Sequence, residues 1–382
     1  MSTTEVKRDI PPKTKLMLAV LAGGRCELCN EFLFEHHLTK KRGVFGQDAH
    51  IRAFSKRGPR GREPGGIADV HAIENLMLLC HRCHKLIDDH PNEHTVEQLR
   101  AKKTQHESRV RLVTGTPPHK VTRLLLYGAN VGDHASPLTV MDALGAVLPG
   151  RYPADREGLV LGMTNSASVD RDEAFWVGEE RQLRRKFTEV VQPHLRNGER
   201  PHFSVFGFAP QPLLTLLGFL LSDIPEADVY QLHREPVGWA WPDGGEVDPV
   251  QLQVDEPSKN GDCPALVLSL SATVADHRVT DVLGHDAAIW RVSVPDPHND
   301  ILRTQADLKQ FRKTARRLLN RIKARHPGAS VIHVFPATPV SVAIELGRIL
   351  MPKADLPLQL YDENRRLGGF QPALHIGERR PD

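Results

Sequence analysis

The chain has 382 residues, of which 40% are hydrophobic and 25% are charged. This balance is typical of a folded globular protein and excludes a disordered chain, and the length suggests two or three domains. No run approaches the roughly 20 apolar residues that a membrane span requires. The polar start of the chain lacks the apolar core of a signal peptide, which predicts a cytoplasmic protein without disulfides.

Positive charge is concentrated in the first third of the chain. Residues 1–116 contain 20 lysines and arginines against 14 acidic residues, whereas residues 117–382 contain 30 against 33. A basic region of this kind is typical of a surface that meets a polyanion. Chance asymmetry is an alternative that charge alone does not exclude.

The expected elements change in character at a proline-rich linker. A polar helix is expected at 95–112, and the residues after it contain two adjacent prolines and a glycine but no periodicity. We therefore predict a first domain at 1–116, a linker at 117–120 and a second domain at 121–382. The second domain opens with an apolar run at 121–127, which is typical of a buried strand.

Beyond the linker, apolar runs alternate with helical stretches, which is the pattern of a parallel α/β fold. Further strands are expected at 202–208, 228–233, 265–271, 288–294, 330–335 and 358–361. Helices are expected at 179–191, 212–222, 304–326 and 339–350. Two stretches of the second domain each contain a proline, a glycine and an Ala-Asp pair in the same order. The corresponding residues of the two stretches are 127 to 129 residues apart. They indicate either two related α/β units or the ordinary similarity of strand–helix–strand segments.

Four of the five cysteines form two C-x-x-C pairs that are separated by 50 residues. Two such pairs supply four thiolates for a tetrahedral zinc ion. Four unrelated buried cysteines would rarely fall into two identical spacings. The predicted zinc ligands are Cys26, Cys29, Cys80 and Cys83.

Three polar residues around the cysteines carry the catalytic prediction. His50 ends a short strand-like segment, Asn75 opens an apolar one, and His84 directly follows the last cysteine. In this order they resemble the HNH endonucleases, and the resemblance covers about residues 16–112. It implies an α+β first domain with a ββα-metal core that the zinc ion stabilises.

The HNH resemblance implies a role for each residue. His50 would be the general base that activates water, Asn75 would orient the imidazole through a hydrogen bond, and His84 would ligate Mg²⁺ or another divalent cation. Many HNH nucleases have an acidic metal ligand immediately before the base, where this chain has Ala49. Asp48 lies on the same strand face as His50 and is the predicted substitute, with a solvated surface carboxylate as the alternative.

A basic, glycine-rich segment follows the predicted base. Its position favours contacts with the phosphates of double-stranded DNA, and the alternative is a solvated loop. No helix-turn-helix motif is visible, so little sequence specificity is expected. The other histidines of this region, His71 among them, are predicted to be surface or structural residues. The predicted DNA contacts are Arg52, Lys56, Arg57, Arg60 and Arg62.

The second domain resembles the SAVED sensor domains, in which two CARF-like Rossmann units are fused and bind cyclic oligonucleotides. The similar segments are 206–218, 228–233, 268–271 and 333–347, together with Trp239 and Trp241. The order of the two domains resembles that of effector nucleases in bacterial CBASS anti-phage systems. No G-x-G-x-x-G fingerprint follows a predicted strand, which argues against a dinucleotide-dependent dehydrogenase.

Ligands of parallel α/β sheets bind at the carboxyl ends of the strands. The predicted cyclic-nucleotide contacts either follow a predicted strand or are tryptophans suited to stacking on a base, although a core role is equally expected for any one tryptophan. They are Asn130, Trp176, Gln211, Trp239, Trp241, Ser269, Ser271, Pro336 and Thr338.

Together these resemblances imply an anti-phage DNA endonuclease that a cyclic di- or trinucleotide activates, and they suggest that the ligand assembles a dimer to tetramer. One alternative is a constitutive or modification-dependent restriction nuclease, which the negative charge of the second domain disfavours. The other is a non-catalytic zinc-knuckle DNA-binding adaptor, which the complete His–Asn–His set disfavours.

Overall fold

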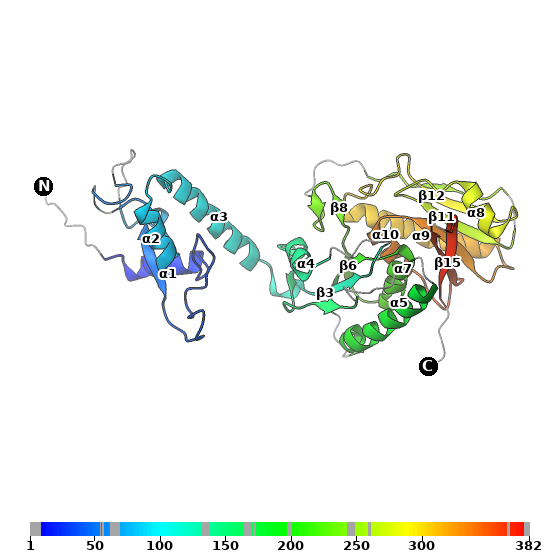
Figure 1. The fold of residues 1–382 in the computed structure, drawn as a ribbon, viewed down its shortest axis with the longest axis horizontal. Helices are drawn as coiled ribbons and strands as arrows, with labels where there is room; N and C mark the ends of the chain where they lie inside the picture. Colours follow the sequence, from blue (N-terminus) through cyan, green and yellow to red (C-terminus); the bar gives the residue numbers. More distant parts are fainter. Residues whose placement is uncertain are drawn as a thin grey trace. The chain divides into compact units, whose positions relative to one another are not determined.

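Figure 1 shows the fold as a computed structural model. The structure describes residues 9–53, 55, 57–61, 69–131, 138–162, 170, 173–196, 201–242, 249–258, 261–364 and 367–377. The chain divides into two compact units, Met1–Pro117 and Pro118–Asp382, which are considered in turn. Within the described residues, no helix combines the length and the apolar character needed to cross a membrane.

The first unit contains a two-stranded sheet that is followed directly by a helix. β1 (Gly46–His50) and β2 (Leu76–Cys80) pair antiparallel, and α2 (His81–Asp89) begins at the next residue. All five residues of β2 are buried, because α1 (Pro12–Leu21) and α2 both pack against this strand. Burial of both faces explains why β2 is a continuous apolar run rather than an alternating one.

The helix predicted before the linker is confirmed as α3 (Val96–Thr114). Thr95 and Gln98 form a capping box, in which each side chain accepts the other residue's backbone N–H. Lys103 on α3 reaches the buried Glu27, with Nζ 3.6 Å from Oε1. This ion pair ties α3 to the loop that carries the first cysteine pair.

The second unit contains two sheets (Figure 1), and the first has five strands. The order is β4-β3-β6-β7, β5 also pairs with β3, and every pairing is parallel. The strands are β3 (Val121–Gly128), β4 (Tyr152–Pro153), β5 (Leu159–Val160), β6 (Phe203–Phe208) and β7 (Ala227–Val229). The helices of this half are α4 (Val140–Val147), α5 (Glu173–Lys186), which continues through a π-helical turn (Phe187–Val191) into α6 (Gln192–Arg196), and α7 (Gln211–Leu221).

The second sheet has six strands in the order β10-β12-β11-β13-β14-β15. The four central strands run parallel, whereas the edge strands β10 and β15 are antiparallel to their neighbours. The strands are β10 (Gln253–Asp255), β11 (Pro264–Ser269), β12 (Ala288–Ser293), β13 (Ile332–Ala337), β14 (Leu358–Asn364) and β15 (Gly369–Ile376). The helices are α8 (Asp276–Leu283), α9 (Gln305–Arg325) and α10 (Val340–Arg348), and a small hairpin, β8 (His233–Arg234) with β9 (Val237–Gly238), follows the first sheet.

The structure confirms the mixed α/β fold expected for the second domain, and it adds strands that the sequence patterns did not indicate, which are β4, β5, β10, β15 and the hairpin of β8 and β9. The strand expected at 228–233 ends early, at Val229. β15 contains Pro372, a residue that is unfavourable inside a sheet. A proline is tolerated at a sheet edge because its missing N–H needs no partner there, and the pairing with β14 is irregular at this point.

The helices α7 and α10 pack together at two glycines. A Cβ atom on Gly218 would lie 1.9 Å from the carbonyl oxygen of Ile344, and one on Gly347 would lie 1.9 Å from that of Thr215. Only glycine permits so close an approach of two backbones. One hydrophobic core runs from the first sheet through these helices to the second. The recurring sequence segments therefore correspond to β6–α7 and β13–α10, which favours their interpretation as related units.

Candidate functional site

The four predicted zinc ligands converge in the first unit. Cys26 and Cys29 lie in the loop after α1, Cys80 ends β2, and Cys83 lies in the first turn of α2. Their sulfur atoms all lie within 4.8 Å of one another, and Cys29 Sγ is 3.7 Å from Cys80 Sγ. Four thiolates at this separation could hold a tetrahedral zinc ion. Among the described residues, no other group of three or more His, Cys, Asp or Glu side chains is close enough to hold a metal.

His50 and His71 contact each other at the end of β1. His50 Nε2 lies 3.3 Å from His71 Nδ1, and His71 is buried. Burial lowers the pKa of His50, and the neighbouring His71 and His84 lower it further. His71 is therefore a partner of the predicted base that the sequence interpretation treated as a surface or structural residue. Its only sequence signal is its place in the segment just before Asn75.

Asn75 has a different role from the predicted one. Its amide nitrogen donates to the carbonyl oxygens of Arg52, at 3.0 Å, and Val70, at 2.9 Å, and its amide oxygen accepts the N–H of Arg52 at 3.0 Å. Both amide hydrogens are used in these bonds. The predicted hydrogen bond to the His50 ring is therefore replaced by bonds that fix the backbone following His50.

His84 lies on α2 between two polar partners. Its Nδ1 is 2.8 Å from Gln47 Oε1, and its Nε2 is 3.4 Å from Asp88 Oδ2. Asp48, the predicted second metal ligand, forms an ion pair with Lys15 at 3.6 Å instead. The structure therefore replaces Asp48 by Asp88 as the carboxylate beside His84. The sequence signal for Asp88 was its spacing, because residues four apart share one face of a helix.

Arg60, a predicted DNA contact, is a structural residue. Its side chain is buried and donates to the carbonyl oxygens of Ile51, at 2.6 Å, and Ile87, at 2.5 Å. It also donates to Asp88 Oδ1 at 3.0 Å. Arg60 therefore joins the end of β1 to α2, and it is not available for phosphate.

The remaining cations of the basic segment differ in exposure. Arg52 is only 8% exposed, so little of its side chain is open to a phosphate. Arg57 is exposed, as a phosphate contact requires. Lys56 and Arg62 lie outside the described residues.

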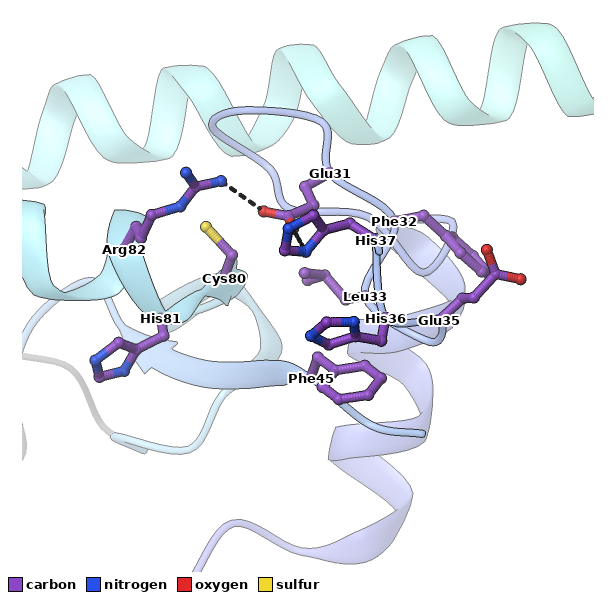
Figure 2. A pocket seen from close by; sticks show the side chains of 10 residues that line it. All are labelled: Glu31, Phe32, Leu33, Glu35, His36, His37, Phe45, Cys80, His81 and Arg82. Atoms are coloured by element: carbon purple, nitrogen blue, oxygen red, sulfur yellow. Dashed lines mark hydrogen bonds and ion pairs between the residues drawn. The ribbon is translucent and has the colours of Figure 1, made fainter. Parts of the chain in front are cut away.

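A pocket of about 230 Å³ borders the cysteine cluster (Figure 2). Cys80 and Arg82 line one side of it, and the rings of His36 and His37 stack with centroids 4.9 Å apart on the other. Phe45 meets the edge of His36 at 5.5 Å. His50 and His84 do not line this pocket, so it is separate from the predicted catalytic residues.

Several predicted ligand contacts of the second unit meet one another inside the protein. Gln211 Oε1 accepts hydrogen bonds from the N–H and the hydroxyl of Thr338, at 3.1 and 2.8 Å. Ser269 is buried, and its Oγ accepts from Arg291 Nη1 at 3.0 Å. Pro336 is buried within β13. Gln211, Thr338 and Pro336 thus support the strand ends from inside, whereas Ser269 and Arg291 also line a pocket of about 290 Å³. Asn130 is partly buried just after β3.

Two of the three predicted tryptophans are core residues. Trp239 is 3% exposed and meets the ring of Phe206 edge-on at 5.6 Å, and Trp176 is 9% exposed within the main core. The predicted stacking on a base is therefore wrong for both, because their faces are already covered. Trp241 is partly buried and packs against His233 with ring centroids 5.3 Å apart.

A pocket of about 750 Å³ lies where the loops after β8, β11 and β12 meet. Ser271, which follows β11, lines it, and its buried hydroxyl oxygen has no hydrogen-bond partner among the described residues. Arg234 and Arg303 line it too, together with Glu235 and Asp300. The sequence interpretation missed both arginines, because their loops are far apart in the chain and carry no motif.

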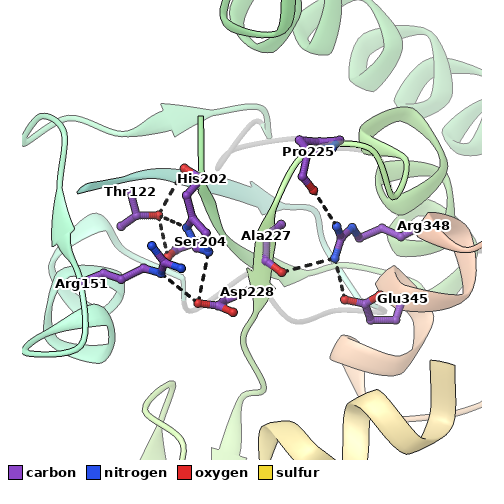
Figure 3. A network of polar contacts seen from close by, with 9 residues as sticks. All are labelled: Thr122, Arg151, His202, Ser204, Pro225, Ala227, Asp228, Glu345 and Arg348. Atoms are coloured by element: carbon purple, nitrogen blue, oxygen red, sulfur yellow. Dashed lines mark hydrogen bonds and ion pairs between the residues drawn. The ribbon is translucent and has the colours of Figure 1, made fainter. Parts of the chain in front are cut away.

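A polar network holds the first sheet to α10 (Figure 3). Asp228 on β7 lies 3.3 Å from His202 Nε2 and 3.2 Å from Arg151 Nε. Burial opposes ionisation of this carboxyl, but His202 and Arg151 hold its pKa below the usual value. Arg348 on α10 donates to the carbonyl oxygen of Pro225 at 3.1 Å, just before β7. Arg348 therefore links the two halves of the second unit, whereas the contacts of Asp228 lie within the first half.

The model of one protein family, the SMODS-associated and fused to various effectors sensor domain (SAVED), matches residues 183–376. Among solved structures, the chain is similar to the Acinetobacter baumannii Cap4 SAVED/CARF-domain containing receptor with the cyclic trinucleotide 2′3′3′-cAAA. That match has 13% identity and a TM-score of 0.44, and it covers 80% of this chain and 64% of that one. The Moraxella osloensis Cap4 SAVED/CARF-domain containing receptor matches with 13% identity and a TM-score of 0.40, over 77% of this chain and 60% of that one.

This chain thus spans less than two thirds of the length of these two structures. No curated protein sequence matches it. The SAVED family model nevertheless covers more than half of the chain, including both sheets from β6 onward and the pocket at the strand ends. The chain therefore belongs to the SAVED family of sensor domains.

Proposed function

We propose that this protein is an anti-phage DNA endonuclease that a cyclic oligonucleotide activates. The SAVED domain would bind a cyclic di- or trinucleotide, and the first unit would act as an HNH nuclease on double-stranded DNA with little sequence specificity. Ligand binding would assemble protomers into an active dimer to tetramer. The observation that carries the proposal is the β1–β2–α2 arrangement, in which His50 at the end of β1 interacts electrostatically with His84, the residue that directly follows Cys83 of the four-cysteine cluster.

The sensing role is supported by family membership and by the pocket at the strand ends. Ligands of parallel α/β sheets bind in this position. Each nucleotide of a cyclic oligonucleotide carries a phosphate, which Arg234 and Arg303 would pair with, and the Ser271 hydroxyl would gain a partner. Raising the active fraction from about 1% to 99% requires a preference of about 5.5 kcal/mol for the active state. A ligand held by several charge-assisted hydrogen bonds can supply this.

The nuclease role is supported by the donor set of the first unit. His50 would take the proton of the attacking water, and Asn75 would hold the backbone next to it. His84 and Asp88, whose nearest polar atoms are 3.4 Å apart, would hold Mg²⁺ or a related cation, separate from the zinc. One imidazole and one carboxylate fit such an ion, because Mg²⁺ completes its shell with water and phosphate oxygens. The bound cation would stabilise the charge that develops on the phosphate.

DNA contact would come from the basic segment after β1. Arg57 is exposed there, and Lys56 and Arg62 stand in the same segment of the sequence. Phosphate contacts made by such residues weaken steeply with salt and carry no sequence information. We therefore expect cleavage to depend strongly on ionic strength and little on sequence.

Plasmid cleavage by the full-length protein with Mg²⁺ tests the proposal. Reactions without ligand are compared with reactions that contain each member of a panel of cyclic di- and trinucleotides. Cleavage should require one of these ligands, and His50→Ala should cleave at least about 10²-fold more slowly with any of them. Full-rate cleavage without ligand would contradict the gating and favour a constitutive nuclease. Ligand binding without cleavage under any condition would favour a DNA-binding adaptor.

The pocket is tested by ligand affinity. Arg303→Ala should weaken binding of the activating ligand by about tenfold or more, since a hydrogen bond to a charged group contributes about 1.5–3 kcal/mol. Arg185→Ala, which removes an exposed arginine of α5 that does not line the pocket, is the matched control. Equal affinities of both variants and the wild type would exclude this pocket as the ligand site.

A further inference from the structure

Gln47 stands at the centre of a row of polar side chains that joins β1 to α2. Its amide oxygen lies 2.8 Å from His84 Nδ1, and its amide nitrogen lies 3.3 Å from His81 Nδ1. His81 and His84 are three residues apart in the first turns of α2, so both face the strand that carries Gln47. One side chain of β1 therefore contacts two histidines of the helix.

The contact with the amide oxygen favours one tautomer of His84. An amide oxygen accepts hydrogen bonds and cannot donate them, so the hydrogen of the neutral imidazole must be on Nδ1. Nε2 then presents a lone pair, and this atom faces Asp88 Oδ2 at 3.4 Å. A neutral imidazole with a free lone pair is the form that ligates metals, and the hydrogen bond made by the other nitrogen selects it.

The carboxylate beside His84 is held in a similar way. Asp88 Oδ1 accepts a hydrogen bond from Arg60 Nη2 at 3.0 Å. Arg60 is itself fixed by the carbonyl oxygens of Ile51 and Ile87. The other oxygen of the carboxylate, Oδ2, is the one that faces His84. Each side chain of the pair thus has one polar atom engaged by the protein and one directed at its partner.

We propose that Gln47 is a positioning residue that holds His84 in the Nδ1–H tautomer, so that Nε2 and Asp88 together can bind a divalent cation. The inference rests on the proposed function, because it concerns the cation site of the same nuclease centre. Without the Gln47 oxygen, the Nε2–H tautomer competes, and that form directs a hydrogen rather than a lone pair at Asp88. Gln47 contacts neither water nor phosphate in this role and acts only through His84.

The experiment compares three variants of the full-length, zinc-loaded protein. Gln47→Ala removes the acceptor, Gln47→Glu keeps an oxygen acceptor of similar length, and His81→Ala removes only the partner of the amide nitrogen. The tautomer of His84 is determined by ¹⁵N NMR of histidine-labelled protein, with its signal assigned by His84→Ala. The affinity for Mn²⁺ alone, without DNA, is measured by electron paramagnetic resonance. Zinc content and melting temperature show that each variant is folded.

Wild-type protein should show His84 with its hydrogen on Nδ1. Gln47→Ala should populate the Nε2–H form and weaken Mn²⁺ binding by about 10- to 100-fold, the usual cost of losing a residue that orients a metal ligand. Gln47→Glu should restore both properties, and His81→Ala should leave the His84 tautomer unchanged. A folded Gln47→Ala protein with the wild-type tautomer and wild-type Mn²⁺ affinity would overturn the inference.

The outcomes separate this inference from the proposed nuclease. A Gln47-dependent tautomer and Mn²⁺ affinity in a protein that never cleaves DNA would support the role of Gln47 and reject the nuclease. Cleavage that needs His50 but is accompanied by Mn²⁺ binding insensitive to both Gln47→Ala and His84→Ala would reject the role of Gln47 and retain the nuclease.

Discussion

The two units of this protein build their sites in opposite ways. In the first, the cysteine cluster and the histidines come from β1, β2, α2 and the loop after α1, and the repeated C-x-x-C spacing marks both halves of the cluster although they are 50 residues apart. In the second, the pocket is assembled from loops after β8, β11 and β12, and the sheets that place these loops are held together by two closely packed helices. A local motif is therefore readable from the sequence, whereas a site made of distant loops depends on the complete fold.

The largest expected effect is that removal of zinc unfolds the first unit and leaves the second unit folded. A structural zinc site contributes on the order of 10 kcal/mol to folding. Of the two calorimetric transitions expected, one for each unit, Cys80→Ser or chelation should therefore abolish that of the first unit. The second unit has its own core and should keep its transition and its ligand affinity. Cys263→Ser, which changes the cysteine outside the cluster, is the control. An unchanged first transition in Cys80→Ser would contradict the zinc site.

The next effect is confined to the second unit and concerns the contact of α7 with α10. Gly218→Ala places a Cβ atom 1.9 Å from a backbone oxygen that cannot move without displacing α10. We expect the free energy of unfolding of the second unit, measured with urea, to fall by more than about 4 kcal/mol. The control is Gly178→Ala on α5, where a Cβ meets no atom within 4 Å and should stabilise the helix by about 0.5–1 kcal/mol. Similar stabilities of the two variants would show that the helices do not pack this closely.

The third effect is catalytic and belongs to the first unit. His50→Ala should lower the rate of ligand-activated plasmid cleavage by about 10²–10⁴-fold, the usual contribution of a general base. Zinc content, melting temperature and ligand affinity should not change, because His50 is only partly buried at a strand end. His90→Ala, an exposed histidine just after α2, is the matched control. Cleavage by His50→Ala at the control rate would remove His50 from the mechanism.

The first unit also shows where the sequence misleads even near a specific motif. Arg60 stands in a glycine-rich basic segment and reads as a solvated cation, but folding brings two carbonyl oxygens and Asp88 around its guanidinium. Asn75 was predicted to bond to the imidazole of His50, yet its amide bonds to the backbone N–H of Arg52 and the carbonyl oxygen of Val70. Residue type and order were predictable, whereas hydrogen-bond partners were not, because they depend on backbone groups that sequence patterns do not describe.

In the second unit the strands were predictable and the ligand contacts mostly were not. Apolar runs identify buried strands regardless of the rest of the fold, and this approach found most of the parallel strands. Trp239 was assigned to a site because two tryptophans lie close together in the sequence, but the first is in the core and only the second is partly exposed. The sequence contains no motif that marks Arg303 as a ligand contact, because it reaches the pocket only where its loop meets the loop at Arg234 and Glu235, which follows the first sheet.

The smallest predicted effect tests whether the second unit depends on its polar network, as the first is predicted to depend on zinc. Because the pKa of Asp228 is lowered in the folded protein, its carboxylate stabilises the fold above its unfolded pKa of about 3.9, and this contribution disappears as the pH falls through the folded value. Asp228→Asn should therefore lower the free energy of unfolding of the second unit at pH 7 by less than about 1 kcal/mol, because the side chain is partly exposed. The melting temperature should fall slightly as a result. The difference from wild type should close below about pH 4, where the wild-type carboxylate begins to protonate. Asp281→Asn, an exposed change on α8, should show no such convergence. A difference that persists unchanged into acid would mean that the side chain acts through its shape rather than its charge.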